Sequence, residues 1–563
     1  MSLQFIFGNS GSGKSHYLYQ QIVEESIRHP EKNYLVLVPE QFTMQTQKDL
    51  CMAHPRGGIM NIDVLSFGRL AHRVFEETGK ERQPILDDEG KNLVLRKIAG
   101  NYEDELTVLK GNLKKQGYIS EVKSVISEFT QYGIDFEQLD SFMEGLNSES
   151  YLYYKLKDIR KVYEGFEDYL RDKYITKEEL LDVLSQNVAE AKMLKDSVIA
   201  MDGFTGFTPV QNRLIGELLK VCDKIMLTVE IDRREDPFVY KHPYQLFALS
   251  KQMVTSLTEV AQEVKVEIDE PVWLCKNPPY RFKENPEMAF LEEELFRYSR
   301  RKYSGEKMQS ISLHEVHTPQ EEAQYVAEEI RRLVREEGYR YREIAVIASD
   351  LNTYADSLEK ACERYEIPVF MDHKKSILLN SFVEYLRSLL VMVEQNYTYE
   401  SVFRYLRTGL CGFTRDEVDR LENYCLALDL KGFKKWDQVW VRKTPMTKKE
   451  ELEELNQLRV RFVEKLTPLH TVLKKRRKTV KEITLAVYEY LVQEKIQEQL
   501  AELEQKFQEE GELALAKEYA QIYRIVLELF DKFVELLGEE EIPLKEYCEL
   551  LDAGLEEAKV GVI

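Results

Sequence analysis

The first fifteen residues hold the sequence feature that most restricts the fold. Residues 8–15 read Gly-Asn-Ser-Gly-Ser-Gly-Lys-Ser and match the complete pattern G-x-x-x-x-G-K-[ST]. An apolar run at residues 3–7 precedes the motif, and a helical pattern from Lys14 to about Arg28 follows it. A strand, a glycine loop and a helix in this order form the phosphate-binding loop of nucleotide-binding proteins. The sequence therefore predicts an α/β fold in which this loop ends a parallel strand.

Each residue type in the loop is one that phosphate or Mg²⁺ binding requires. Glycines let the backbone curl so that consecutive N–H groups, together with a helix N-terminus, face phosphate oxygens. Lys14 would reach the β- and γ-phosphates of ATP, and the Ser15 hydroxyl would join the Mg²⁺ shell. The alternative is a chance glycine turn before a helix, which the matching context disfavours. The candidate nucleotide-binding residues are Gly8, Asn9, Ser10, Gly11, Ser12, Gly13, Lys14 and Ser15.

A P-loop enzyme also needs a carboxylate at the end of a neighbouring strand to hold Mg²⁺ through water. Residues 198–202 form an apolar run that ends in Asp202, as a Walker B segment does. Gly203 follows, where hydrolytic P-loop helicases usually carry a glutamate that activates water. General-base assistance is worth about 10²–10⁴-fold in rate, so the sequence predicts nucleotide binding with poor hydrolysis. Alternatively, Asp202 only begins a turn, because this short pattern is weak alone.

Apolar runs that alternate with helical patterns extend the α/β prediction along the chain. Strands are predicted at 34–39, 62–65, 197–202 and 224–230, and helices at 66–77 and 209–221. Apolar residues at helical spacing predict an all-helical insertion between about 87 and 195. A second alternation predicts strands at 311–314, 344–348 and 368–370, and helices at 319–336 and 351–365. The chain after 376 is predicted to be almost wholly helical, and the proline-rich residues 271–286 are a candidate linker.

Composition excludes several classes of protein. No run approaches the roughly 18–20 apolar residues of a membrane helix, so no membrane partner is expected. The amino terminus enters a strand directly, which leaves no room for a signal peptide and predicts a cytoplasmic chain. The seven cysteines form no C-x-x-C pair, so a zinc or iron–sulfur site within these residues is not expected.

The spacing of the two nucleotide motifs is informative. Lys14 and Asp202 lie 188 positions apart (202 − 14), with the helical block between them. A compact P-loop kinase rarely needs such an insertion, whereas superfamily 1 helicases carry one in each of two motor domains. The spacing therefore argues against a small-molecule phosphotransferase.

Several segments together resemble the AddB family, one of the two component families of the bacterial ATP-dependent helicase/nucleases AddAB. They are the loop 8–15, Leu-Val-Pro-Glu-Gln-Phe-Thr at 37–43, Val-Leu-Ser-Phe-Gly-Arg-Leu at 64–70 and Met-Asp-Gly-Phe-Thr-Gly-Phe-Thr-Pro at 201–209. Residues 321–330, 344–347 and 365–368 look like the opening of a second UvrD-like motor domain, and 410–423 and 432–436 look like its helical insertion. The resemblance covers the whole chain.

The resemblance implies P-loop (RecA-like, UvrD-like) parallel sheets with large all-helical insertions. Residues 1–90 and 195–295 would form the first motor-like domain, and 91–194 its helical insertion. Residues 305–375 would begin the second motor-like domain, and 376–563 would be its insertion. We expect the chain to be the amino-terminal half of a longer protein. The later helicase motifs, the arginine for the γ-phosphate, the nuclease carboxylates and a four-cysteine iron–sulfur cluster would lie beyond it.

The resemblance also implies a function. AddAB-type complexes resect double-strand DNA ends for repair by homologous recombination, so the implied partners are DNA ends, single-stranded DNA and an AddA-like helicase/nuclease subunit. ATP and Mg²⁺ are the implied cofactors. Two departures agree with Gly203: too few residues precede Gly8 for an adenine-reading glutamine element, and residues 230–234 read Glu-Ile-Asp-Arg-Arg where active motors carry Gly-Asp-x-x-Gln. A weakened, DNA-binding subunit is the first hypothesis, and an active ATP-driven translocase is the second.

DNA binding must be reconciled with charge. The chain carries 78 Lys and Arg against 99 Asp and Glu, a net charge of −21, so contact with phosphates would depend on local basic groups. The first candidate group is Arg297, Arg300, Arg301 and Lys302, with Tyr298 and Tyr303 able to stack on bases. The second is Lys474, Lys475, Arg476, Arg477 and Lys478. Charge runs are usually solvated surface, and that alternative stays open for both groups.

Overall fold

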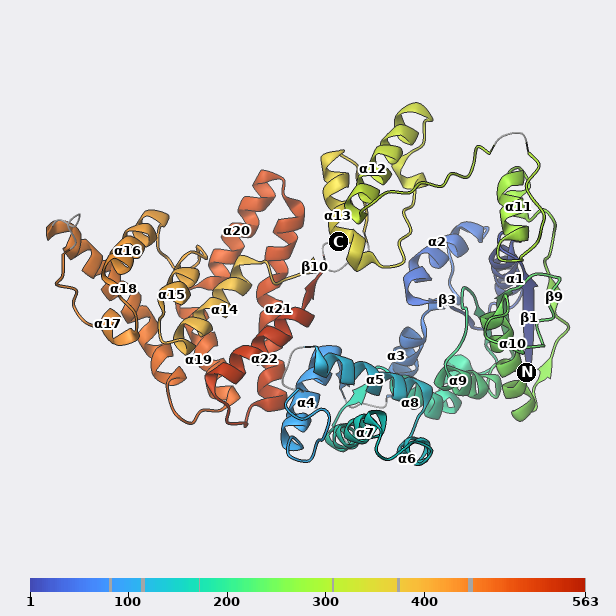
Figure 1. Cartoon of the computed structure of the whole chain (residues 1–563). Helices are drawn as coiled ribbons and strands as arrows, with labels where there is room; N and C mark the ends of the chain where they lie inside the picture. The colour runs from blue at the N-terminus through green and yellow to red at the C-terminus, as the bar shows by residue number, and fades with distance from the viewer. Residues whose placement is uncertain are drawn as a thin grey trace. The chain divides into compact units, whose positions relative to one another are not determined.

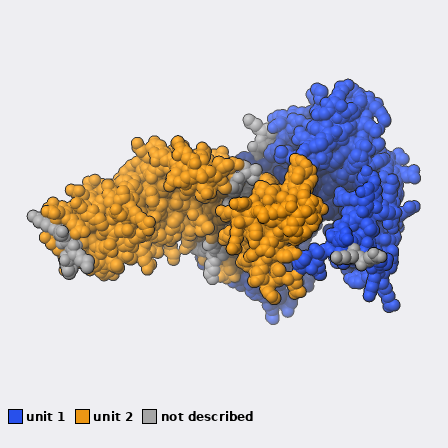
Figure 2. Space-filling model, turned by 90° about the horizontal axis from the view of Figure 1, so that it is seen from above, with its two compact units in different colours: residues 1–87, 104–110, 120–314 blue, residues 88–103, 111–119, 315–563 orange. Residues whose placement is uncertain are grey.

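A computed structural model describes residues 1–79, 84–112, 117–171, 173–305, 308–371, 375–443 and 449–561. The chain divides into two compact units, which Figure 2 shows in different colours. Unit 1 comprises Met1–Asp87, Asp104–Lys110 and Ser120–His314. Unit 2 comprises Asp88–Glu103, Gly111–Ile119 and Glu315–Ile563.

Unit 1 is built on a parallel sheet with the order β3-β2-β6-β7-β1-β8, and β9 also pairs with β1. The strands are β1 (Ser2–Gly8), β2 (Tyr34–Leu37), β3 (Ile62–Leu65), β6 (Val198–Met201), β7 (Lys224–Glu230), β8 (Glu267–Ile268) and β9 (Val272–Trp273). Gly8 lies in register with Glu230, and Leu37 with Met201. The carboxyl ends of β1, β2, β6 and β7 therefore share one edge, where ligands bind in open α/β sheets.

Helices follow these strands as the sequence predicts. α1 (Lys14–Arg28), η1 (Glu40–Phe42), α2 (Thr43–Ala53), α3 (Phe67–Thr78), α9 (Pro209–Leu219), α10 (Ala248–Glu263), η4 (Tyr280–Phe282) and α11 (Pro286–Glu294) belong to the sheet region (Figure 1). Between β3 and β6 lie β4 (Ile85–Leu86), α4 (Asp88–Asn101), α5 (Tyr118–Tyr132), α6 (Phe136–Glu144), α7 (Tyr151–Leu170), β5 (Ile175–Thr176), α8 (Leu180–Asn187), η2 (Val188–Glu190) and η3 (Lys192–Leu194).

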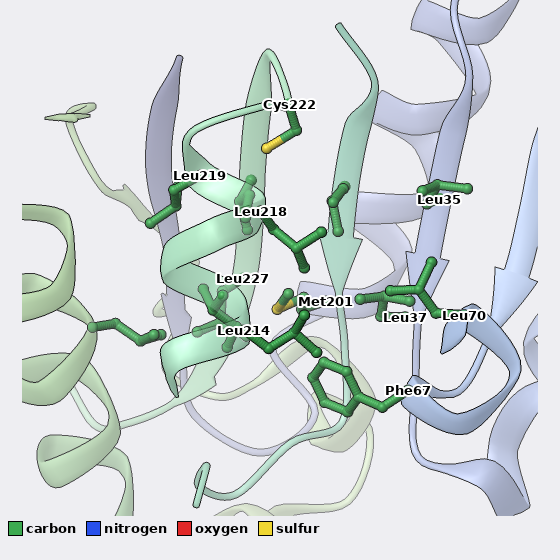
Figure 3. Close-up of a cluster of buried hydrophobic side chains, with 14 of the residues drawn as sticks. Leu35, Leu37, Phe67, Leu70, Met201, Leu214, Leu218, Leu219, Cys222 and Leu227 are labelled. Atoms are coloured by element: carbon green, nitrogen blue, oxygen red, sulfur yellow. The ribbon is translucent and has the colours of Figure 1, made fainter. Parts of the chain in front are cut away.

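Two hydrophobic clusters cover the two faces of the sheet. Alternate residues of β1 separate between them, since Phe5 joins one cluster and Ile6 the other. This period of two is what a strand buried on both faces requires. Figure 3 shows Leu214 and Leu218 of α9 among Met201, Leu227 and Phe67 in the larger cluster. The sheet edge that carries the P-loop is thus fixed by burial on both sides.

Unit 2 is almost wholly helical. It contains α4, α12 (Pro319–Glu336), η5 (Tyr341–Glu343), α13 (Leu351–Arg364), α14 (Ser381–Glu394), α15 (Tyr399–Leu406), α16 (Arg415–Leu428), α17 (Phe433–Asp437), α18 (Lys449–Leu473), α19 (Val480–Gln493), α20 (Ile496–Glu510), α21 (Leu513–Leu537) and α22 (Leu544–Glu557). The short strands β10 (Lys375–Ser376) and β11 (Lys559–Val560) pair antiparallel. The predicted helical character after residue 376 is confirmed.

Three predicted strands are wrong. Residues 311–314, 344–348 and 368–370 run without strand pairing in the described chain. Their apolar side chains are largely exposed: Leu313 is 97% exposed, Ile347 94% and Phe370 73%. A β-strand needs a neighbour for its backbone N–H and C=O groups, and the described residues around them supply only helices. Apolar alternation alone therefore did not suffice here.

The candidate linker at 271–286 is also wrong in part. Its first residues form β9, and Leu274 N–H donates to the Phe7 carbonyl at 2.8 Å. The segment then continues through η4 across the P-loop. The predicted insertion 91–194 divides as well, because α4 clusters with unit 2. The four-part domain division stays a prediction.

A core substitution tests whether α9 holds the sheet. Changing the fully buried Leu218 to Ala should lower the free energy of unfolding by about 2–5 kcal/mol, because apolar contacts are lost and a cavity remains. Urea denaturation followed by circular dichroism measures this change. Leu249→Ala on α10, where the side chain is 64% exposed, is the matched control and should stay within about 0.5 kcal/mol. Equal effects for the two variants would contradict the packing described.

Candidate nucleotide-binding site

The P-loop leaves β1 at Gly8 and enters α1 at Lys14. Gly13 is the N-cap residue of α1 and has φ +93°. No side chain of the described residues accepts a capping hydrogen bond at this end of the helix. The Tyr17 N–H donates to the Gly13 carbonyl at 2.9 Å, so the N–H groups of residues 14–16 have no partner inside the helix. Unpaired N–H groups and the helix dipole favour an anion at this end of α1. The predicted order of strand, loop and helix is confirmed, and the nucleotide-binding role of the loop stays a prediction.

Two glycines leave space that a side chain would fill. A Cβ on Gly11, whose φ is +72°, would lie 2.8 Å from Arg281 Cβ. A Cβ on Gly8 would lie 2.4 Å from Ser12 Oγ. Real Cβ atoms do not approach other heavy atoms so closely, so both positions require glycine. These glycines therefore let the loop pack closely on Ser12 and on the segment that carries Arg281.

Two polar atoms in the loop are buried without a hydrogen-bond partner among the described residues. They are Ser12 Oγ and Asn9 Oδ1. A buried polar group that lacks a partner costs about 1–3 kcal/mol, so the loop is incomplete as it stands. A phosphate oxygen would accept a hydrogen bond from Ser12. The residues present therefore fit a phosphate-bearing ligand.

Lys14 is held within the loop. Its Nζ donates to the Asn9 carbonyl at 2.9 Å. Burial lowers the pKa of Lys14 below the usual 10.5, while the nearby carboxylates of Glu230 and Asp202 oppose this shift. Burial disfavours the charged form of an amine, so added negative charge in the cleft would help to keep Lys14 protonated.

Asp202 follows β6 directly and is 7% exposed. One carboxylate oxygen, Oδ1, accepts a hydrogen bond from Thr228 Oγ1 at 2.5 Å, and Oδ2 accepts one from the Tyr19 hydroxyl at 2.8 Å. Burial, and then the charge of Asp202, raise the pKa of Tyr19 above its usual 10. The carboxylate is thus fixed by side chains from α1 and β7, which is more than a residue that merely begins a turn requires.

These groups line one cleft of about 610 Å³. Its walls include the loop residues 10–15, Asp202, Gly203, Glu230 and Arg281. Ser15 is exposed at this cleft, as a Mg²⁺ ligand needs to be. Gly203 has φ +78°. Residues 10–15 of the predicted loop and Asp202 are therefore brought together in this cleft, whereas Gly8 and Asn9 are not among its lining residues.

Four residues at the site were not predicted from the sequence: Tyr19, Thr228, Glu230 and Arg281. The backbone N–H of Arg281 donates to the Gly11 carbonyl at 3.0 Å, so this arginine lies next to the P-loop. From the sequence, a phosphate-contacting arginine is expected only in a later segment of the protein. Glu230 ends β7 beside Gly8, and its strand-end position was a usable signal. The position of Arg281 had no signal, because its segment resembled a linker.

The first basic group is divided by the structure. The guanidinium of Arg297 pairs with Asp232 at 2.8 Å and with Glu235 at 3.0 Å, and its side chain is 14% exposed. Arg301 pairs with Glu293 at 3.1 Å and with Glu294 at 2.5 Å. Contacts of this kind place Arg297 in the fold rather than at a DNA surface, which corrects its nomination. The exposed members are Arg300, Arg301, Lys302 and Tyr298, whereas the Tyr303 ring packs on Phe290.

The second basic group is divided in the same way. Lys478 is 7% exposed, and its Nζ donates to the Lys475 carbonyl at 3.0 Å. Burial lowers the pKa of Lys478. Its nomination is therefore corrected to a structural role. The remaining members, Lys474, Lys475, Arg476 and Arg477, are exposed.

Other classes of site leave no trace in the described chain. No group of three or more His, Cys, Asp or Glu side chains is placed to hold a metal ion within those residues. All seven cysteines carry free thiols. None of the described helices has the length and apolar character needed to cross a membrane.

Comparisons with known proteins identify a family and relatives that align over the whole chain. Residues 5–292 match the family model "ADDB, N-terminal", and residues 284–557 match "UvrD-like helicase C-terminal domain". Proteins named as the B-type subunits of ATP-dependent helicase/deoxyribonucleases align over the full chain. They include those of Lachnoclostridium phytofermentans, at 42% identity, Caldanaerobacter subterraneus, at 34%, and Clostridium novyi, at 33%. In each case 49% of the relative is covered, so the chain spans about half the length of these relatives.

The close approach at Gly11 gives a test of the loop. Gly11→Ala should weaken ATP binding by about tenfold or more, because the new methyl group would meet Arg281 and displace loop N–H groups from the phosphates, and a hydrogen bond to a charged group is worth about 1.5–3 kcal/mol. Fluorescence titration with an ATP analogue measures the affinity. Gly57→Ala is the matched control, since Gly57 has φ +68° with nothing within 4 Å of a new Cβ. It carries the same backbone strain and should leave the affinity unchanged.

Proposed function

Because the chain belongs to the AddB family, the B-type subunits of ATP-dependent helicase/deoxyribonucleases, we propose that it is a helicase-like, DNA-binding subunit of a heterodimeric helicase/exonuclease. The complex would process double-strand breaks for homologous recombination, with an AddA-like helicase/nuclease subunit as partner. The cleft of this chain would bind ATP with Mg²⁺ and hydrolyse it weakly or not at all. A cytoplasmic location and an iron–sulfur cluster beyond residue 563 stay predictions.

One observation carries the nucleotide part of the proposal. The loop 10–15 and Asp202 line the same cleft, while the residue after Asp202 is a glycine. The uncapped N-terminus of α1 and Lys14 would bind the phosphates, and Ser15 and Asp202 would hold the metal ion. Mg²⁺, when bound, supplies charge neutralisation to the phosphates. A site with these groups and without a glutamate directly after Asp202 would bind ATP more readily than it would activate water.

Gly203 adds a backbone argument. Its φ of +78° lies in the left-handed region, where a side chain costs roughly 1–2 kcal/mol. Pro39 Cδ would lie 3.6 Å from an added Cβ, so space itself is available. The conformation of the turn therefore disfavours a glutamate even where there is room for one.

The alternative function is an active superfamily 1 translocase. Glu230 and Arg281 favour it, because they place a carboxylate and a guanidinium in the same cleft. Glu230 would then act on the water in place of a glutamate after Asp202, and Arg281 would stabilise the phosphates. A small-molecule phosphotransferase has no comparable support, since the second family model and the named relatives are helicase-related.

Substitution of the loop lysine separates the two functions. Lys14→Ala should weaken ATP binding by about 10–100-fold, because a charge-assisted contact is worth about 1.5–3 kcal/mol. ATP turnover stimulated by single-stranded DNA should be close to background with and without the substitution. Lys48→Ala, an exposed lysine on α2, is the control and should bind ATP normally.

Two results would contradict the proposal. Robust turnover that Lys14→Ala abolishes would establish the translocase, and Glu230→Gln would then be the next variant to measure. Failure of the unsubstituted chain to bind ATP at all would remove the nucleotide role.

The exposed basic run tests DNA binding. Changing Lys474, Lys475, Arg476 and Arg477 together to Ala should weaken binding to single-stranded DNA and flatten its dependence on salt. Each lost phosphate contact lowers the slope of log K against log[salt] by about 0.7. Fluorescence anisotropy between about 50 and 200 mM salt measures both quantities. Lys517→Ala with Lys545→Ala, which removes exposed charges elsewhere in unit 2, is the control. An unchanged slope in the fourfold variant would identify the run as solvated surface.

A further inference from the structure

The carboxylate of Asp202, which directly follows β6, accepts hydrogen bonds from two other side chains. Tyr19 lies on α1, five positions after Lys14, and its hydroxyl donates to Asp202 Oδ2 at 2.8 Å. Thr228 lies on the neighbouring strand β7, and its hydroxyl donates to Asp202 Oδ1 at 2.5 Å. The two oxygens of Asp202 thus accept hydrogen bonds from two different elements, the helix α1 and the strand β7.

A third hydroxyl completes the arrangement. Thr46 on α2 is 4% exposed, and its Oγ1 lies 3.3 Å from the Tyr19 hydroxyl oxygen. A tyrosine hydroxyl has one proton, and here that proton goes to Asp202. Thr46 must therefore donate to Tyr19. The hydroxyl groups of Thr46, Tyr19 and Thr228 form one connected set with Asp202 as the terminal acceptor.

We propose that Tyr19 is the positioning residue of this site: with Thr228, it orients the Asp202 carboxylate so that the remaining lone pairs face the Mg²⁺ of a bound Mg²⁺–nucleotide. This inference rests on the proposed nucleotide binding. Groups that hydrogen-bond a metal-associated carboxylate typically contribute about 10–100-fold to metal affinity. Tyr19 lines the same cleft as Asp202, and its hydroxyl proton is donated to that carboxylate, so it would act on the metal through Asp202.

A purely structural role predicts a different result. If Tyr19 only satisfies a buried carboxylate, its removal loosens the fold and weakens nucleotide binding equally with and without Mg²⁺. A positioning role concerns the metal alone. The Mg²⁺-dependent part of nucleotide affinity therefore distinguishes the two, and it is a binding measurement that does not depend on turnover.

The experiment compares the Kd for ATP in EDTA with the Kd in saturating Mg²⁺, using competition with a fluorescent ATP analogue on the 563-residue chain. Tyr19→Phe keeps the ring and removes the hydroxyl. The ratio of the Kd in EDTA to the Kd in Mg²⁺ should fall by about tenfold or more. The Kd in EDTA itself should stay nearly unchanged. Thr228→Val, which removes the other donor, should act in the same direction and serves if Tyr19→Phe fails to fold. Tyr17→Phe is the matched control, because Tyr17 lies on the same helix and packs against the core.

Each outcome has one meaning. A normal ratio in Tyr19→Phe, with a Mg²⁺ effect in the unsubstituted chain, overturns the positioning role and leaves the proposed function intact. Equal weakening in EDTA and in Mg²⁺ also overturns it, in favour of the structural role. If the unsubstituted chain binds ATP with no Mg²⁺ effect, or does not bind ATP, the proposed function and this inference fail together.

Discussion

The parallel pairing of β1 with β7 is the interaction on which the cleft depends. It sets Gly8 beside Glu230, and the pairing of β7 with β6 sets Met201, the residue before Asp202, beside Leu227. A shift of register by one residue would exchange the two faces of β1 and bury the wrong side chains. Because Phe5 and Ile6 belong to different hydrophobic clusters, such a shift would disrupt both. The core therefore fixes the relative positions of the loop and the carboxylate.

The positively and negatively charged side chains that line the cleft nearly balance one another. Lys14 and Arg281 are its cationic side chains among the described lining residues, and Asp49, Asp202 and Glu230 are its carboxylates. Side chains alone therefore do not make the cleft strongly positive, in a chain whose net charge is −21. Binding of a triphosphate would depend on the unpaired N–H groups at the start of α1 and on a divalent cation, both of which act locally.

Local patterns predicted the first strand, the glycine loop, α1 and the strand before Asp202, because these parts are local. The loop 8–15 and Asp202 are each specified by neighbouring residues, and the strands and helices around them follow from short-range pattern. Arg281 and Tyr19 could not be found in this way. Arg281 contacts Gly11, and Tyr19 contacts Asp202, and both pairs are far apart in the sequence. The strands predicted at 311–314 and 344–348 failed for the opposite reason. Their pattern is adequate, but a strand also requires a partner, which sequence pattern does not supply.

The turn after β6 explains why a glutamate directly after Asp202 would be difficult to introduce. Asp202 is fixed by Tyr19 and Thr228, and the next residue, Gly203, takes a left-handed φ of +78°. A glutamate at 203 would add a side chain at a backbone conformation that disfavours one. To adopt an ordinary φ, the turn would have to move the carboxylate before it, which two hydrogen bonds oppose. The backbone of the turn and the two hydrogen bonds to Asp202 thus act together to disfavour a glutamate at position 203.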